Sequence, residues 1–145
     1  MSWKKLLADK RVTVEPASKA EIDNLRSIVA RSFHDVAVAG LSADTRFVLA
    51  YDAARTLSLM IVRSAGYRPK STGGHFNTFL ALGAANKAFS AISVYFDSCR
   101  IKRNDCEYDF AGGITETEAA NLLTEIRKFA VDVEAWIRKR HPHLV

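Results

Sequence analysis

Apolar residues recur at steps of three and four along most of the sequence, and this spacing strongly constrains the fold. The most regular run lies near the C-terminal end and consists of Ala119, Leu122, Ile126, Phe129, Val133 and Trp136. A second run spans residues 89–110 and consists of Phe89, Ile92, Phe96, Cys99, Arg103, Cys106 and Phe110. Because residues three and four apart share one face of a helix, both runs predict helices with one buried side.

The ends of five helices can be placed from capping residues and glycines. Ser18 and Glu21 have the spacing of a capping box and open the first helix, which we expect to end near Gly40. Thr115 and Glu118 form a second capping box and open the last helix. The three helices between them are expected over residues 42–65, 75–85 and 86–108, with a loop at 66–74 marked by proline and glycine.

The composition also favours a helical fold. Three prolines and seven glycines among 145 residues leave little material for a loop-rich β sandwich, and no convincing strand is visible. We therefore predict an all-α fold, an antiparallel up-and-down bundle of four to five helices forming one domain over residues 1–145. Residues 1–17 are expected to form an arm of unassigned structure, and the C-terminal segment RKRHPH is expected to leave the fold.

Charge and cysteine content indicate a cytoplasmic protein. The net charge of +5 is compatible with a polyanionic partner. Cys99 and Cys106 would lie roughly 10 Å apart along one helix, too far for a disulfide, which favours a reducing compartment. The start of the chain lacks the apolar run of a signal peptide, and Asp52 and Arg55 interrupt its most apolar segment, residues 47–62. We therefore expect no membrane association.

The four histidines do not predict a metal site. His141 and His143 lie in a basic tail without the clustered Cys, Asp or Glu partners that a metal needs, and His34 is expected on an exposed helix face. His75 follows two glycines at a predicted helix start, where a structural role is as plausible as a functional one. We therefore expect no metal and no cofactor.

Arg103 is the one charged residue in the apolar run of residues 89–110. A guanidinium is not buried without a partner, so Arg103 should pair with Glu107, lie where the run leaves the core, or line a polar cleft or subunit interface. Arg100, Asn104 and Tyr108 form a neighbouring stripe at steps of four. These groups suit the binding of a phosphate, although a surface network of ion pairs has the same spacing.

The segment FDSCRIKRNDCEYDF, residues 96–110, resembles the motif helix of the HEPN superfamily of compact helical bundles. In that motif an Arg is followed by a polar residue, often Asn, and then by a His; Arg103 and Asn104 match the first two positions. The segment YDAARTLSLMIVRSAGYRPK is similar to the second helix and loop of bacterial HEPN proteins, and GGHFNTFLAL resembles the Gly-His start of the next helix. The resemblance covers roughly residues 45–110.

This resemblance implies RNA cleavage without metal, commonly by the toxin of a toxin–antitoxin pair acting as a homodimer. Arg103 would hold the phosphate. Tyr108 stands where the motif has His, and lowering a Tyr pKa to neutrality needs about three units, or roughly 4 kcal/mol. The general base would otherwise come from His75 or Glu107.

Two functions therefore remain open. In the first, a ribonuclease controlled by an antitoxin acts through Arg103, Asn104 and Tyr108, with Arg100, Glu107 and His75 in binding roles. In the second, which the resemblance also implies, an inactive domain uses the same surface to bind RNA, a nucleotide or a nucleotidyltransferase-like partner.

Overall fold

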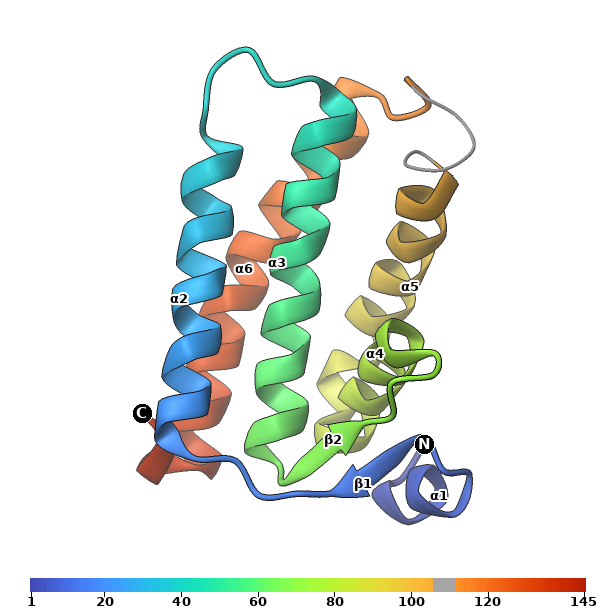
Figure 1. The fold of residues 1–145 in the computed structure, drawn as a ribbon, viewed down its shortest axis with the longest axis vertical. Helices are drawn as coiled ribbons and strands as arrows, with labels where there is room; N and C mark the ends of the chain where they lie inside the picture. Colours follow the sequence, from blue (N-terminus) through green and yellow to red (C-terminus); the bar gives the residue numbers. More distant parts are fainter. Residues whose placement is uncertain (106–111) are drawn as a thin grey trace.

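The computed structural model describes residues 1–105 and 112–145, and it confirms the predicted all-α helical bundle (Figure 1). The α-helices of the described residues are α1 (Trp3–Ala8), α2 (Lys19–Val36), α3 (Ala43–Ser64), α4 (Gly74–Ala85), α5 (Ser90–Asn104) and α6 (Glu116–Arg140). Two 3₁₀ turns, η1 (Lys87–Phe89) and η3 (Pro142–Leu144), and two short strands, β1 (Val12–Val14) and β2 (Tyr67–Pro69), complete the fold. No helix in these described ranges is both long and apolar enough to cross a membrane.

The four longest helices alternate in direction along the chain, α2 and α5 running one way and α3 and α6 the other (Figure 1). The central helix is α3, which packs against α2, α4, α5 and α6. All six residues of the apolar run near the C-terminal end are buried on α6, as predicted. Phe96 of α5 is fully buried, with ring centroids 5.7 Å from Phe79 of α4 and 5.1 Å from Phe129 of α6. It joins α5 to two of its neighbours.

The capping box predicted at Thr115 is confirmed. The backbone N–H of Glu118 donates to the Thr115 hydroxyl at 3.0 Å, and the Thr115 N–H donates to the Glu118 carboxylate at 3.1 Å. The box predicted at Ser18 is half formed, because Ser18 accepts from the Glu21 N–H while the Glu21 carboxylate binds Arg63 instead. A buried guanidinium is the stronger partner for this carboxylate.

The absence of strands was predicted wrongly. β1 and β2 pair antiparallel, with Val12 opposite Pro69 and Val14 opposite Tyr67. Three residues per strand give too short an alternation to be recognised in a sequence, and the pairing joins segments more than fifty residues apart. The pairing fixes the N-terminal arm across one end of the bundle (Figure 1).

Arg63 of α3 also holds this arm. Its side chain is 1% exposed, and two of its nitrogens donate to the Glu21 carboxylate at 2.8 Å. The same guanidinium donates to the backbone carbonyls of Glu15, Pro16 and Tyr67. One buried cation therefore links the arm, α2 and β2, and its hydrogen bonds offset the cost of burying the charge.

The C-terminal segment was also predicted wrongly, because it does not leave the fold. η3 turns back toward α2, and Leu144 is 2% exposed within the core cluster. The ring of His141 lies 5.0 Å from that of Trp136.

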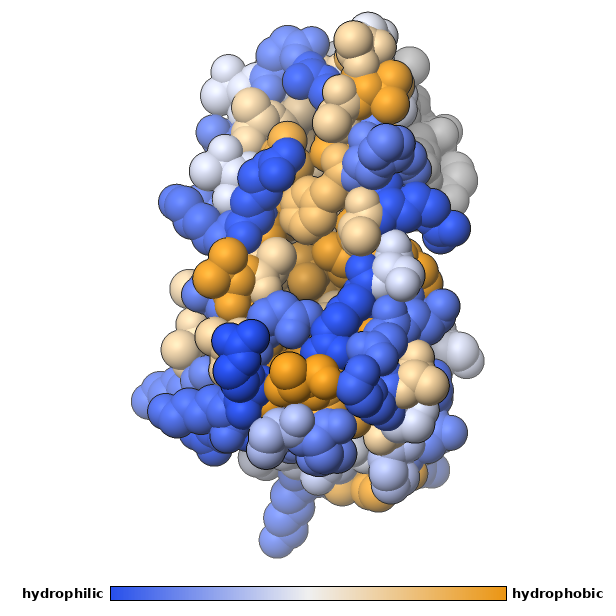
Figure 2. Space-filling view, turned by 90° about the vertical axis from the view of Figure 1, so that its left-hand side faces the viewer, coloured by the Kyte–Doolittle hydropathy of each residue, from blue (hydrophilic) through white to orange (hydrophobic). Residues whose placement is uncertain are grey.

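On the side of the molecule shown in Figure 2, hydrophilic residues flank a strip in which hydrophobic residues gather.

Candidate functional site

The predicted site residues of α5 face the start of α4 across a cleft of about 280 Å³. We call it the arginine cleft; it is lined by Gly73, Gly74, His75, Phe76, Arg100, Arg103 and Asn104. The sequence singled out four of these residues, Arg100, Arg103, Asn104 and His75, and the fold brings all four together. Glu107, Tyr108 and Cys106 lie outside the described residues.

Arg103 lines this cleft near the C-terminal end of α5. It follows Cys99, a free thiol that is 3% exposed, by one helical turn and is itself partly exposed. Its guanidinium carbon lies 5.7 Å from the centroid of the Tyr51 ring, and Nη1 donates to the Asn104 side-chain oxygen at 3.5 Å. Of the three arrangements considered for Arg103, the structure shows the polar cleft. The pairing with Glu107 and the end of the run involve residues outside the described ranges.

Arg100 is held by its neighbours on α4 and α5. Its Nε donates to the Asp97 carboxylate at 2.7 Å, and its guanidinium carbon lies 5.7 Å from the centroid of the Phe76 ring. Arg11, from the N-terminal arm, lies 5.2 Å from the same ring centroid. Phe76 therefore gathers two cations beside the cleft through cation–π contacts.

Asn77, which the sequence did not predict as a site residue, holds the α4 side of the cleft, opposite α5. Its buried side chain donates to the carbonyls of Lys70 and Thr72 at 3.3 and 3.1 Å and accepts from Arg11 at 3.3 Å. These bonds hold the loop that precedes α4. Gly73 ends this loop with a φ of 69°, a left-handed conformation that favours glycine. The loop thereby presents the first turn of α4 to the cleft, with the Gly74 N–H donating to the Ser71 carbonyl at 3.1 Å.

His75 forms a hydrogen bond with Tyr51, a fully buried residue of α3. The Tyr51 hydroxyl oxygen lies 2.9 Å from Nδ1 of His75. Burial, together with the positive charges of Arg55, Arg103 and Arg100, lowers the pKa of His75 from 6.5 to about 4. Burial raises the pKa of the Tyr51 phenol, although Arg103, Arg55 and Arg100 act in the opposite direction. Both side chains are therefore neutral at pH 7, and the arginines supply the charge of the cleft.

Tyr51 and Arg55 could not be assigned to the site from sequence. Tyr51 reads as one more apolar position of a buried helix, and Arg55 as an interruption of the same segment. One signal was present: they lie four apart, so they share a face of α3.

This set of groups can bind an anion with a tetrahedral array of oxygens. Arg100 and Arg103 provide charge and forked donors, Asn104 provides an amide, and His75 provides a neutral imidazole. Among residues 1–105 and 112–145, no group of three His, Cys, Asp or Glu side chains is arranged to hold a metal ion. Arg100 and Arg103 contribute positive charge to the arginine cleft.

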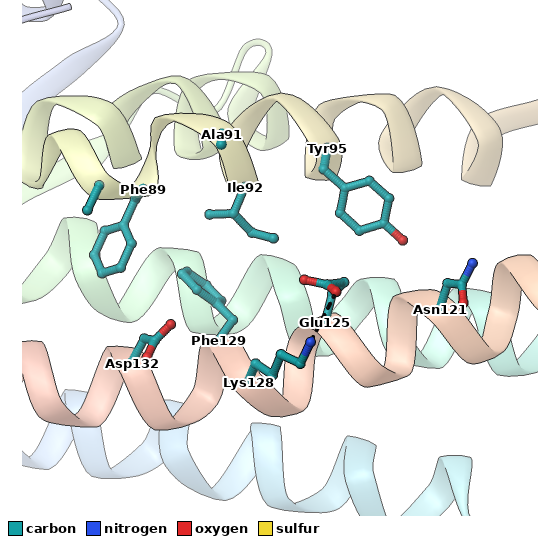
Figure 3. Close-up of a pocket in the computed structure, with 10 residues that line it drawn as sticks. Phe89, Ala91, Ile92, Tyr95, Asn121, Glu125, Lys128, Phe129 and Asp132 are labelled. Carbon is teal, nitrogen blue, oxygen red and sulfur yellow. Dashed lines mark ion pairs between the residues drawn. The ribbon is translucent and has the colours of Figure 1, made fainter.

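A larger groove lies on the other side of α5, between α5 and α6 (Figure 3). Its volume is about 640 Å³, and its walls include Phe89, Ile92, Tyr95, Asn121, Glu125, Lys128, Phe129 and Asp132. We call it the α5–α6 groove. Among the described residues that line it, Lys128 is the only cation and lies 3.7 Å from the Glu125 carboxylate on the same helix, while Asp132 adds a second negative charge. This lining suits an anion poorly.

Comparisons with protein-family models, with curated proteins and with solved structures find no match for this chain.

Proposed function

We propose that the arginine cleft binds a phosphate group of RNA, and that the protein is a HEPN-like ribonuclease acting without metal as the toxin of a toxin–antitoxin pair. One observation carries the proposal: His75 lies in the same 280 Å³ cleft as Arg100, Arg103 and Asn104, although 25 or more residues separate it from them. Together these residues supply both parts of the required chemistry, a phosphate clamp and an imidazole.

In the proposed reaction Arg100 and Arg103 hold the non-bridging oxygens of the phosphate. The ribose 2′-oxygen attacks phosphorus and loses its proton to the neutral imidazole of His75, while the bond to the 5′-oxygen breaks and that oxygen takes a proton from water. The bound phosphate opposes the positive field of the arginines. Its negative charge raises the pKa of His75 and makes the ring a better base.

The second function, binding without chemistry, has its own support. A His75 pKa of about 4 in the free protein is low for a general base at neutral pH. The motif position that carries His in the HEPN superfamily is Tyr108 in this chain. An inactive domain would use the same cleft to bind RNA, a nucleotide or a nucleotidyltransferase-like partner.

The proposal includes a homodimer, a cognate antitoxin and a cytoplasmic location. Val94 and Ile101 of α5 are 72% and 51% exposed and lie seven residues apart, on one face of the helix. Exposed apolar side chains in such an arrangement favour contact with a second copy. Sedimentation analysis of the wild type and of Ile101→Glu tests the dimer, which the substitution should dissociate.

The deciding experiment measures cleavage of a labelled mixed RNA in the presence of EDTA. Wild type should cleave, and Arg103→Ala and His75→Gln should each lose at least 100-fold in rate. Arg31→Ala and His34→Gln, exposed substitutions on α2, serve as matched controls and should leave the rate unchanged. Circular dichroism establishes that each variant is folded.

The remaining outcomes separate the two functions. RNA binding without cleavage, lost in Arg103→Ala, would establish the binding domain and exclude the ribonuclease. Tyr108→His sharpens this test, because a site that lacks only its proton carrier should gain cleavage of tenfold or more. Equal binding by wild type and Arg103→Ala would exclude both functions for this cleft.

A further inference from the structure

A second hollow adjoins the arginine cleft between α4 and α5. Its volume is about 160 Å³, and it is lined by Phe76, Phe79, Leu80, Ser93, Val94 and Asp97. We call it the α4–α5 hollow. Drug-sized ligands fill pockets of roughly 300 to 1,000 Å³, so this hollow suits a smaller group such as one planar heterocycle.

The hollow and the cleft share a wall. Phe76 lines both of them. Asp97 of the hollow accepts a hydrogen bond of 2.7 Å from Nε of Arg100, which lines the cleft. A ligand whose phosphate contacts Arg100 can therefore place its next group beside Phe76 and Asp97. In a nucleotide that neighbouring group is the nucleoside.

The polar groups of the hollow are acceptors. Asp97 is a carboxylate, and no described residue forms a hydrogen bond with its second oxygen, Oδ2. Ser93 donates its hydroxyl hydrogen to the Ser90 carbonyl at 2.7 Å, so its oxygen is left to accept. The remaining walls are apolar and aromatic, which suits the face of a base. The hollow therefore favours a flat ring with several N–H donors on one edge.

Guanine is the RNA base that fits this description. Its Watson–Crick edge carries adjacent N–H donors at N1 and N2, which a carboxylate can accept together. Adenine and cytosine place a ring-nitrogen acceptor beside their amino group, and uracil flanks its single N–H with two carbonyls, so each sets a lone pair against Asp97. We infer that the α4–α5 hollow is a guanine subsite, which makes guanosine the nucleoside next to the phosphate in the arginine cleft. This inference rests on the proposed phosphate site.

The test compares ligand affinities by calorimetry on the full chain. The probes are the four ribonucleoside monophosphates, in both 3′ and 5′ forms, and ribose 5-phosphate, which has the phosphate without a base. In at least one of the two forms, the guanosine nucleotide should bind wild type at least tenfold more tightly than the other three nucleotides and ribose 5-phosphate. Equal affinities for all four bases would overturn the inference.

Variants of the hollow locate the preference. Asp97→Asn should lower the affinity for guanosine monophosphate to that for the adenosine nucleotide. Ser93→Ala should lower the affinity for guanosine monophosphate several-fold. Asp132→Asn and Ser98→Ala are the matched controls, since Asp132 lies in the α5–α6 groove and Ser98 of α5 donates to the Tyr95 carbonyl. A guanine preference that persists undiminished in Asp97→Asn would contradict the subsite.

Ribose 5-phosphate distinguishes this failure from failure of the proposed function. Asp97 also holds Arg100, so Asp97→Asn could act through the phosphate site. In that case the affinity for ribose 5-phosphate falls as much as the affinity for guanosine monophosphate, and the subsite is rejected. Ribose 5-phosphate that binds wild type but not Arg103→Ala, with no preference among the bases, would leave the phosphate site in place and remove the subsite. No binding of any probe would remove both.

Discussion

The α5–α6 groove and the arginine cleft, on two sides of α5, differ in volume and in chemistry. The smaller of the two, the arginine cleft, is the better candidate for a functional site. The α5–α6 groove has more than twice the volume of the arginine cleft, about 640 against 280 Å³. Helix α5 packs closely against α4 and α3, and the Phe96–Phe129 ring contact joins it to α6. Hydrogen bonds instead hold the surroundings of the cleft in place, among them those of Asn77 and of the Tyr51–His75 pair. The arginine side chains that meet in the cleft are therefore a better indicator of a candidate site than the volume of either space.

Phe96→Ala tests whether the two sides share a support, and it should have the largest effect. Phe96 is fully buried between Phe79 of α4 and Phe129 of α6. Removing a buried phenyl ring typically costs about 3–5 kcal/mol in the free energy of unfolding. Urea denaturation followed by circular dichroism measures this loss. Val131→Ala, at a position 70% exposed on α6, should change stability by less than about 0.5 kcal/mol. A loss below about 1 kcal/mol for Phe96→Ala would show that α5 is held by other contacts.

The double variant Arg100→Ala/Arg103→Ala tests whether the cleft carries the binding of RNA. Without both guanidiniums the affinity for a short single-stranded RNA should fall about 100-fold, and the slope of log K against log salt should decrease by roughly 1. Fluorescence anisotropy over a series of salt concentrations measures both quantities. Lys128→Ala in the α5–α6 groove is the control. If it weakened binding as much as the double variant does, the groove would share the RNA site.

The pH dependence of His75 tests the electrostatics of the cleft. Its folded-state pKa of about 4 lies below the value of 6.5 for a free imidazole, so the unfolded chain binds more protons between these two values. The free energy of unfolding should therefore fall as the pH falls from 6.5 to 4, and His75→Gln should show a smaller fall. In NMR titrations the pKa should rise in Arg103→Ala and on addition of phosphate. An unchanged pKa in both experiments would show that the arginines do not act on the ring.

Glu125→Gln should have the smallest effect. The carboxylate of Glu125 and the Lys128 ammonium lie 3.7 Å apart, and their side chains are 42% and 69% exposed. Exposed pairs of this kind contribute about 0.2–1 kcal/mol at most. We expect thermal denaturation to show a change in melting temperature near the error of the measurement, and RNA affinity to stay the same. A clear loss of affinity would contradict the assignment of the groove as separate from the phosphate site.

The helices could be predicted because their signals are local. Steps of three and four, a capping box at Thr115 and a glycine after α3 are all read within a few residues. The strands and the buried C-terminal turn depend on partners far along the chain, as in the pairing of Val12 with Pro69. A sequence pattern of three residues carries too little information to identify them.

The candidate site was predictable in part for the same reason. Arg100, Arg103 and Asn104 follow one another on a single helix, so their common face could be read from spacing. Tyr51 and Asn77 contribute through contacts between helices or with a loop, and each reads alone as an ordinary buried residue. His75 was considered as a base, but its bond to Tyr51 and its low pKa depend on the packing of α3 against α4.

The anchoring of the N-terminal arm has a consequence for the order of folding. Residues 1–16 are synthesised before every segment that holds them: Leu6 and Val12 pack with Val62 and Ala81 in a small cluster of their own. During translation the arm can therefore reach its final position only after α3, β2 and α4 have left the ribosome. Closing this long loop costs entropy that local helix formation does not. We expect the arm to be the last part to gain protection from amide exchange during refolding. Because Arg11 in this arm contacts Phe76 and Asn77, we expect the arginine cleft to be completed only at that final step.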